Sequence, residues 1–255
     1  MNSNLTAELY CAGKLMKILF TNDDGFNDQG IDELERALTA AGHEVWVCAP
    51  STQRSTCSHA LTLHRNLMVT KVSERRYHCE GYPADCVLFA ISGAIPCPEP
   101  DVVVSGINNG YNLSTDLIYS GTVGAAAEAV VRGYPAVAVS TSGAFGDAAA
   151  FVAKYIEKLS SICPEGCYIN INVPENSKLR YKTSILGNIH YHDMLRGSGD
   201  TFQVTGEELP SMDKPYDSST DYALVKDQST VALSCVRILP ALDEAGQAAL
   251  SDLDG

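Results

Sequence analysis

Two adjacent carboxylates follow a short apolar run near the start of the chain. Asp23 and Asp24 stand between Asn22 and Gly25, directly after the apolar residues 18–20. The apolar run predicts a buried strand, and ligands of open α/β sheets bind at the carboxyl ends of the strands. Neighbouring carboxylates at such a point repel each other and lose hydration, which is costly unless a cation binds them. The pair therefore predicts a divalent metal site, with a helix-capping turn as the alternative interpretation.

Polar side chains also follow two other predicted strands. Ser55 lies in a loop rich in Ser and Thr, and Asn108 and Asn112 lie in an Asn- and Gly-rich segment after the predicted strand 101–104, which is apolar from residue 102. Asparagine and serine offer oxygen atoms, and glycine lets the backbone come close to a ligand. Oxygen donors from Asp, Ser and Asn suit Mg²⁺ or Mn²⁺ rather than zinc. Taken alone, each segment is also compatible with an ordinary loop.

A predicted helix begins at a run of small residues. Ser120, Gly121 and Thr122 directly precede an alanine-rich stretch. The free backbone amides and the positive dipole end of a helix N-terminus suit a phosphate group, although an ordinary Ser cap has the same sequence. A metal site beside a phosphate site indicates hydrolysis of a phosphate ester.

The composition excludes several classes of protein. The 255 residues are 45% hydrophobic and carry a net charge of −13, with 31 acidic against 18 basic residues. Nucleic-acid polymers and anionic membranes need a basic surface, so we expect neither as a partner. The nine cysteines are irregularly spaced without a C-x-x-C pair, which favours reduced thiols in a cytoplasmic protein. The sequence contains no membrane-length apolar run, and residues 1–15 lack the features of a signal peptide.

Short apolar runs alternate with amphipathic stretches along most of the chain. Predicted strands are 17–21, 44–48, 68–71, 77–80, 101–104, 136–140 and 168–173, and predicted helices are 30–41, 83–92, 121–132 and 148–159. This alternation predicts an α/β, Rossmann-like, three-layer fold with a mostly parallel, doubly wound sheet.

The two ends of the chain differ in character from the middle. We expect a loose extension over 1–15, with Met16 as an alternative start, and a catalytic core over 16–180. We expect residues 181–255 to form a C-terminal extension for oligomer contacts, in which 222–225 and 231–237 are predicted to pair as a β-hairpin.

The four polar segments also carry a family resemblance. MKILFTNDDG, APSTQRS, SGINNGYNL and YSGTVGAAAEA resemble the motifs of the SurE family of metal-dependent nucleotidases, over residues 16–236. The resemblance implies a Rossmann-like core and a C-terminal extension exchanged between subunits, giving a homodimer or homotetramer. It also implies hydrolysis of nucleoside 5′- and 3′-monophosphates to nucleoside and phosphate by a metal-activated water.

The resemblance further assigns the site residues. One divalent cation per subunit, Mg²⁺ or Mn²⁺, would be held by Asp23, Asp24, Ser55 and Asn108. The phosphate would be contacted by Asn112, Ser120, Gly121 and Thr122. Asp23 or Asp24 would orient the attacking water or accept its proton, which makes both aspartates catalytic.

The chain departs from the family pattern at two positions. Thr56 and Ser114 stand where many relatives have glycine, and we expect them to affect substrate preference rather than activity. Three histidines, His59, His190 and His192, could approach the site, but a surface position is the simpler expectation for each.

Two other classes of function stay open at the level of the sequence. A haloacid-dehalogenase-type phosphatase would form a phospho-aspartate, but that class has Asp-x-Asp, whereas Asp23 and Asp24 are adjacent. A binding module is the other alternative, either a dinucleotide-binding domain or a sensor that binds nucleotide and metal without turnover. No G-x-G-x-x-G follows the first predicted strand, so nicotinamide binding is poorly supported.

Overall fold

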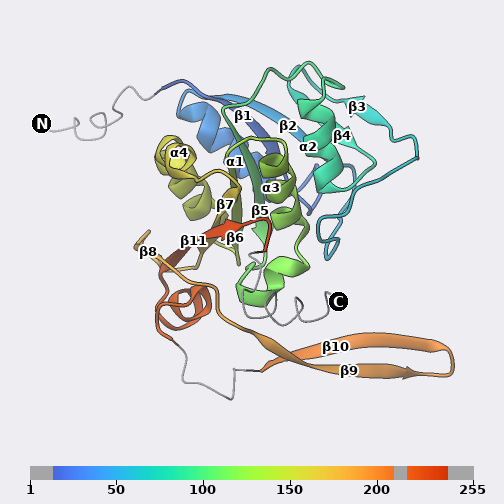
Figure 1. Cartoon of the computed structure of the whole chain (residues 1–255), viewed down its shortest axis with the longest axis vertical. Coiled ribbons are helices and arrows are strands. Elements are labelled where there is room, and N and C mark those ends of the chain that lie inside the picture. The colour runs from blue at the N-terminus through green and yellow to red at the C-terminus, as the bar shows by residue number, and fades with distance from the viewer. Residues whose placement is uncertain (1–13, 210–216, 241–255) are drawn as a thin grey trace, which may run out of the picture.

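The structure is a computed structural model that describes residues 14–209 and 217–240. Its centre is a nine-stranded sheet in the order β3-β4-β2-β1-β5-β6-β7-β11-β8 (Figure 1). The strands of this sheet are β1 (Lys17–Thr21), β2 (Glu44–Pro50), β3 (Val69–Lys71), β4 (Arg76–Cys79), β5 (Val102–Asn109), β6 (Ala136–Thr141), β7 (Cys167–Val173), β8 (Tyr181–Thr183) and β11 (Val231–Arg237). Strands β4, β2, β1, β5, β6 and β7 run parallel, while β3 and β11 are antiparallel to their neighbours β4 and β7.

Helices cover both faces of the sheet. They are α1 (Gln29–Ala40), α2 (Pro83–Ile91), α3 (Gly121–Val131) and α4 (Phe145–Ile162). Helices α1 and α4 pack together on one face, and α2 and α3 pack together on the other (Figure 1). Successive side chains of a strand point to opposite faces, so Ile18 and Phe20 join the core under α1 and α4, while Leu19 joins the core under α2 and α3. Burial on both faces explains why the parallel strands read as continuous apolar runs.

The doubly wound, three-layer architecture confirms the fold predicted from the sequence. The chain winds from β1 to β2 in one direction and then crosses to β5 on the other side of β1. The register pairs Thr21 with Ser105, so the carboxyl ends of β1 and β5 lie side by side. Such a reversal of strand order opens a crevice for ligands. The NDDG and SGINNG segments therefore leave the sheet at this switch point.

The predicted C-terminal hairpin is wrong in its position. Residues Ala223–Asp227 form a helical turn, η2, in which Leu224 and Val225 are buried, and β11 pairs with β7 in the main sheet. The hydroxyl of Thr220 accepts a hydrogen bond from the Ala223 amide and begins this turn, which the apolar run alone did not reveal. The observed hairpin is formed by β9 (His190–Ser198) and β10 (Thr201–Leu209) and projects away from the sheet (Figure 1).

The predicted extension over 1–15 lies outside the described residues except for its last two. A single turn of 3₁₀-helix, η1 (Ser114–Ile118), connects β5 to the segment before α3. In the described part of the chain, no helix has the length and apolar character that crossing a membrane requires.

Candidate metal and phosphate site

A tight turn at the end of β1 presents the two aspartates. The buried side chain of Asn22 accepts a hydrogen bond from the Gly25 amide (3.2 Å) and donates one to the Gly25 carbonyl (3.1 Å). Gly25 has a φ of +105°, which few residues with a side chain adopt. This closed turn fixes the backbone of Asp23 and Asp24 at the switch point.

Asp23 is almost completely enclosed, with 4% of its surface exposed. Its Oδ1 atom accepts a hydrogen bond from the hydroxyl of Thr122. Burial raises the pKa of Asp23 to about 6; the hydrogen bond from Thr122 opposes this rise, and repulsion from Asp24 adds to it. The fold therefore holds a carboxylate here at a cost in free energy, which a bound cation would offset.

Asp24 connects the end of β1 to the end of β5. Its Oδ2 atom accepts a hydrogen bond from the backbone amide of Asn109, at 2.9 Å. Burial raises the pKa of Asp24, and the hydrogen bond from Asn109 opposes that rise. The neighbouring Asn108 donates its side-chain amide to the Gly110 carbonyl (2.8 Å), which orients the carboxamide. Asp24 and Asn108 thus lie together at the carboxyl ends of the neighbouring strands β1 and β5.

The loop after β2 brings Ser55 to the same place. The backbone amide of Arg54 donates to the carbonyl of Asp23 at 2.7 Å, and the Arg54 guanidinium donates to the carbonyl of Glu80 at 2.8 Å. These two bonds fix the backbone next to Ser55, whose side chain is exposed. Thr56 has a left-handed φ of +55°, and its hydroxyl donates to the Ser55 carbonyl (2.7 Å). A left-handed backbone conformation favours glycine, so the side chain of Thr56 is held there at some cost.

The N-terminus of α3 packs directly against Asp23. Ser120 caps the helix by accepting a hydrogen bond from the Val123 amide at 3.1 Å. A Cβ atom on Gly121 would lie 3.0 Å from Asp23 Oδ2 and 2.6 Å from Cys57 Sγ, so the close approach requires glycine. The predicted phosphate turn therefore adjoins the predicted metal ligands.

Asn112 lies in a buried polar cluster that the sequence analysis missed. Its backbone amide donates to Asn172 Oδ1 (2.9 Å), and its carbonyl accepts from the side-chain amides of Asn172 (2.8 Å) and Asn170 (2.9 Å). Its own side-chain amide donates to Ser140 Oγ at 2.8 Å. Polar residues at alternate positions of the otherwise apolar strand β7 were the signal that could have revealed this cluster.

Other polar residues singled out from the sequence serve different contacts. Ser114, at φ +53°, donates its amide and hydroxyl to the fully buried carboxylate of Asp221, each at 2.6 Å. His59 is bound to Glu128 rather than to Asp23. The side chains of His190 and His192 lie outside what the structure describes.

The donor set fits a hard divalent cation. Two carboxylates, a hydroxyl and the oxygen of a carboxamide are hard donors. Mg²⁺ and Mn²⁺ prefer such oxygen ligands. Within residues 14–209 and 217–240, no basic side chain forms an ion pair with Asp23 or Asp24. The described residues contain no cluster of three or more His, Cys, Asp or Glu side chains that could hold a metal. A metal ion held by Asp23 and Asp24 would therefore need Ser55 and Asn108 as its further protein ligands.

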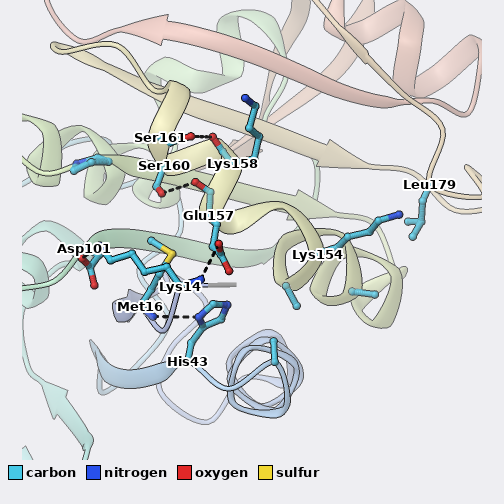
Figure 2. Close-up of a pocket in the computed structure, with 14 residues that line it drawn as sticks. Lys14, Met16, His43, Asp101, Lys154, Glu157, Lys158, Ser160, Ser161 and Leu179 are labelled. Carbon is cyan, nitrogen blue, oxygen red and sulfur yellow. Dashed lines mark hydrogen bonds and ion pairs between the residues drawn. The ribbon is translucent and has the colours of Figure 1, made fainter. Parts of the chain in front are cut away.

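A large cavity of about 1120 Å³ lies at the opposite end of the sheet (Figure 2). Lys14, His43 and Asp101, which precede strands β1, β2 and β5, line it. Its polar groups largely bind each other: Lys14 Nζ contacts Asp101 Oδ1 at 2.9 Å, and the Lys14 amide donates to Glu157 Oε2 at 3.1 Å (Figure 2). The segments that carry the candidate site residues follow the carboxyl ends of β1, β2 and β5. This cavity lies at the opposite ends of the same strands, so it is separate from the candidate site.

Comparison with known proteins agrees with the fold. The family model described as "Survival protein SurE" matches residues 18–193. The protein named 5′-nucleotidase SurE of Desulfitobacterium hafniense strain DCB-2 is 40% identical over 217 residues, covering 79% of this chain and 85% of that protein. Its namesake in Desulforudis audaxviator is 34% identical over 240 residues, covering 88% and 92%. The crystal structure of the SurE protein from Aquifex aeolicus superposes with a TM-score of 0.80 at 29% identity, covering 93% of this chain and 99% of that one. This chain belongs to the SurE family.

Proposed function

We propose that this chain is a metal-dependent phosphomonoesterase that hydrolyses nucleoside 5′-monophosphates, and also 3′-monophosphates, to nucleoside and phosphate. The observation that carries the proposal is the contact between the carboxylate of Asp23 and the N-terminus of α3 at Gly121. A cation site and an anion site that adjoin in this way suit a phosphate ester. The name 5′-nucleotidase, carried by relatives that align along most of the chain, supports the same activity.

One divalent cation, Mg²⁺ or Mn²⁺, would be held by Asp23, Asp24, Ser55 and Asn108. When bound, it supplies Lewis-acid chemistry, which withdraws charge from a phosphoryl oxygen and makes water more acidic. Asp24 has more contact with solvent than Asp23, because it is half-buried whereas Asp23 is enclosed. A carboxylate oxygen of Asp23 or Asp24 orients the attacking water or takes its proton.

The phosphate group would lie at the start of α3. The backbone amides of Gly121 and Thr122 stand in the first turn of the helix, where amides lack partners within the helix. They stabilise the charge that gathers on the phosphoryl oxygens in the transition state. Ser120 and Asn112 would also contact the phosphate; Ser120 caps this helix, and the side-chain amide of Asn112 donates to Ser140 in the buried cluster.

The remaining expectations concern assembly and location. We propose a homodimer or homotetramer formed through the C-terminal extension, because β9 and β10 project from the body with Leu195, Phe202 and Val204 exposed. Solvent-exposed apolar side chains on a projecting hairpin favour contact with another subunit. A cytoplasmic location is consistent with the eight described cysteines, which are all free thiols.

The test is phosphate release across a matrix of metals and substrates. Mn²⁺, Mg²⁺ and EDTA are combined with AMP, 3′-AMP, p-nitrophenyl phosphate and polyphosphate. We expect release from the nucleoside monophosphates with Mn²⁺ or Mg²⁺, and none with EDTA. Binding of AMP and metal without release would instead identify a sensor, and a trapped phospho-aspartate would identify the haloacid-dehalogenase class of mechanism.

A further inference from the structure

The segment that carries Ser55 is fastened at both ends. At its start, the Arg54 amide donates to the Asp23 carbonyl at 2.7 Å. At its end, the amide and the hydroxyl of Ser58 donate to the carbonyls of Tyr119 (2.9 Å) and Ile118 (2.7 Å), just before α3. The intervening residues, including Ser55, therefore span from the end of β1 to the start of α3.

Helix α3 is shaped to receive this segment. A Cβ atom on Gly124 would lie 2.3 Å from the Ser58 carbonyl oxygen and 2.9 Å from the Cα atom of His59. One turn earlier, Gly121 makes room for the side chain of Cys57, whose Sγ atom would lie 2.6 Å from a Cβ atom at that position. Gly124 thus lets the loop backbone lie directly on the helix, and Gly121 makes room for a side chain of the same loop.

A side-chain contact secures the segment at its far end. His59 Nε2 lies 2.8 Å from Oε2 of Glu128, on the same helix, and Glu128 is 2% exposed. The other carboxylate oxygen of Glu128 accepts a hydrogen bond from Arg132 Nε at 2.7 Å. A buried carboxylate is costly unless both oxygens are bound, so the loss of His59 would leave one of them without its partner.

The contact places His59 away from the reacting atoms. Glu128 follows Gly121 by seven residues, which corresponds to ~10 Å along the helix at ~1.5 Å per residue. Gly121 and Thr122 are the residues of α3 that contact Asp23, whereas the carboxylate that binds His59 belongs to a residue about two turns further along the helix. A direct role in proton transfer is therefore not supported by this geometry.

We propose that His59 and Glu128 are positioning residues, which hold the loop against α3 and thereby fix Ser55 beside Asp23 and Asp24. The proposal rests on the metal ligands of the proposed function. It predicts that the contact is already present in the metal-free protein. It also predicts that breaking it weakens metal binding more than it weakens binding of the nucleotide.

The test compares four variants with the wild-type protein. His59→Leu removes the donor, and His59→Gln keeps an N–H group that can reach Glu128. Glu128→Gln weakens the same contact from the helix side and leaves the volume of the side chain almost unchanged. Arg132→Gln is the matched control, since Arg132 binds the same carboxylate from the helix and, among the described residues, its side chain forms no ion pair with the loop.

Two measurements are made besides activity. Hydrogen–deuterium exchange of the metal-free proteins reports the opening of residues 55–60, and electron paramagnetic resonance of free Mn²⁺ reports metal binding. For His59→Leu we expect faster exchange in this segment and roughly tenfold weaker Mn²⁺ binding, in line with the loss of a hydrogen bond to a charged group. Glu128→Gln should show a smaller change in the same direction. His59→Gln should stay close to wild type, and Arg132→Gln should bind Mn²⁺ as wild type does.

The outcomes separate this proposal from the proposed function. Unchanged exchange and Mn²⁺ binding in both His59→Leu and Glu128→Gln would overturn the positioning role, even where AMP hydrolysis proceeds. An equal loss in Arg132→Gln would also overturn it, because the effect would then be general destabilisation. Wild-type protein that binds Mn²⁺ but releases no phosphate would overturn the proposed function, while the exchange and binding results would still decide the role of His59.

Discussion

The hydroxyl of Thr122 donates a hydrogen bond to Oδ1 of Asp23, joining the first turn of α3 to the end of β1. The two residues are 99 positions apart in the sequence, and Thr122 is completely buried. This bond lowers the pKa of Asp23, against the larger effect of burial. One side chain from the proposed phosphate turn thus helps to keep the carboxylate of Asp23, a proposed metal ligand, ionised.

Replacement of Thr122 tests that relationship. Thr122→Val keeps the shape and removes the donor, so the pKa of Asp23 should rise and protons should compete better with the metal. We expect Mn²⁺ binding at pH 7 to weaken by about tenfold, the effect of losing one hydrogen bond to a carboxylate. A titration followed by electron paramagnetic resonance measures this, and Thr122→Ser, which keeps a hydroxyl, is the control. Equal affinity in the Val and Ser variants would refute the prediction.

Asp23 should also destabilise the metal-free protein at neutral pH. Its pKa is raised from 3.8 to about 6 on folding, so the folded state binds the proton more tightly than the unfolded state. The ionised carboxylate therefore costs stability above pH 6, by up to about 3 kcal/mol, and this cost disappears as the pH falls towards 3.8.

Asn at position 23 is neutral at every pH. In EDTA, Asp23→Asn should raise the unfolding free energy by about 1–3 kcal/mol at pH 7.5, and by little near pH 4. Urea denaturation at the two pH values measures both differences. A variant that is less stable than wild type at pH 7.5 would show that the carboxylate is stabilised by the fold without a metal.

Gly121 should be intolerant of any side chain. A methyl group there would meet Asp23 Oδ2 at 3.0 Å and Cys57 Sγ at 2.6 Å, so the Cys57 thiol, the aspartate or α3 must shift. We expect Gly121→Ala to lower AMP turnover by about tenfold or more, because a displacement of the order of 1 Å is costly in catalysis. Gly146→Ala, in the first turn of α4 where a Cβ atom meets nothing within 4 Å, is the matched control. Wild-type turnover in Gly121→Ala would argue against this packing.

Asn172 should contribute to stability through the backbone of Asn112. Its carboxamide accepts from the Asn112 amide and donates to the Asn112 carbonyl, and all these groups are buried. Asn172→Ala leaves the amide of Asn112 without a partner, and we expect a loss of about 2–4 kcal/mol in the free energy of unfolding. Urea denaturation measures it, and a loss below about 1 kcal/mol would mean that the cluster rearranges or admits water.

The sheet and its helices were predictable because their signals are local. Residues 18–20 alternate between the two cores, and the apolar stripe of α1 at Ile31, Leu34 and Leu38 is buried as its spacing predicts. The switch point follows from the strand order. It places Asp23 and Asp24 at the carboxyl ends of the central strands, where ligands of such sheets bind. The assignment of the four metal ligands is still a prediction.

Contacts between distant segments could not be predicted from the sequence. The bond from Thr122 to Asp23 and the contact of His59 with Glu128 depend on how loops lie across helices, for which no periodicity exists. The segment around Leu224 has the apolar character of a strand, but the hydroxyl of Thr220 accepts a hydrogen bond from the Ala223 amide and the segment forms a helical turn. The hydrogen bonds of Ser114 could not be predicted either, because its partner Asp221 lies 107 residues away in the sequence.

The most direct test of the account is the rate of phosphate release from AMP in the presence of Mn²⁺. Asp24→Asn removes a proposed metal ligand, and Asp28→Asn is the control, since Asp28 caps α1 through an oxygen that Asn also provides. The account predicts that Asp24→Asn loses about a hundredfold or more of the wild-type turnover, while Asp28→Asn retains it. Wild-type turnover in Asp24→Asn would contradict the proposed site.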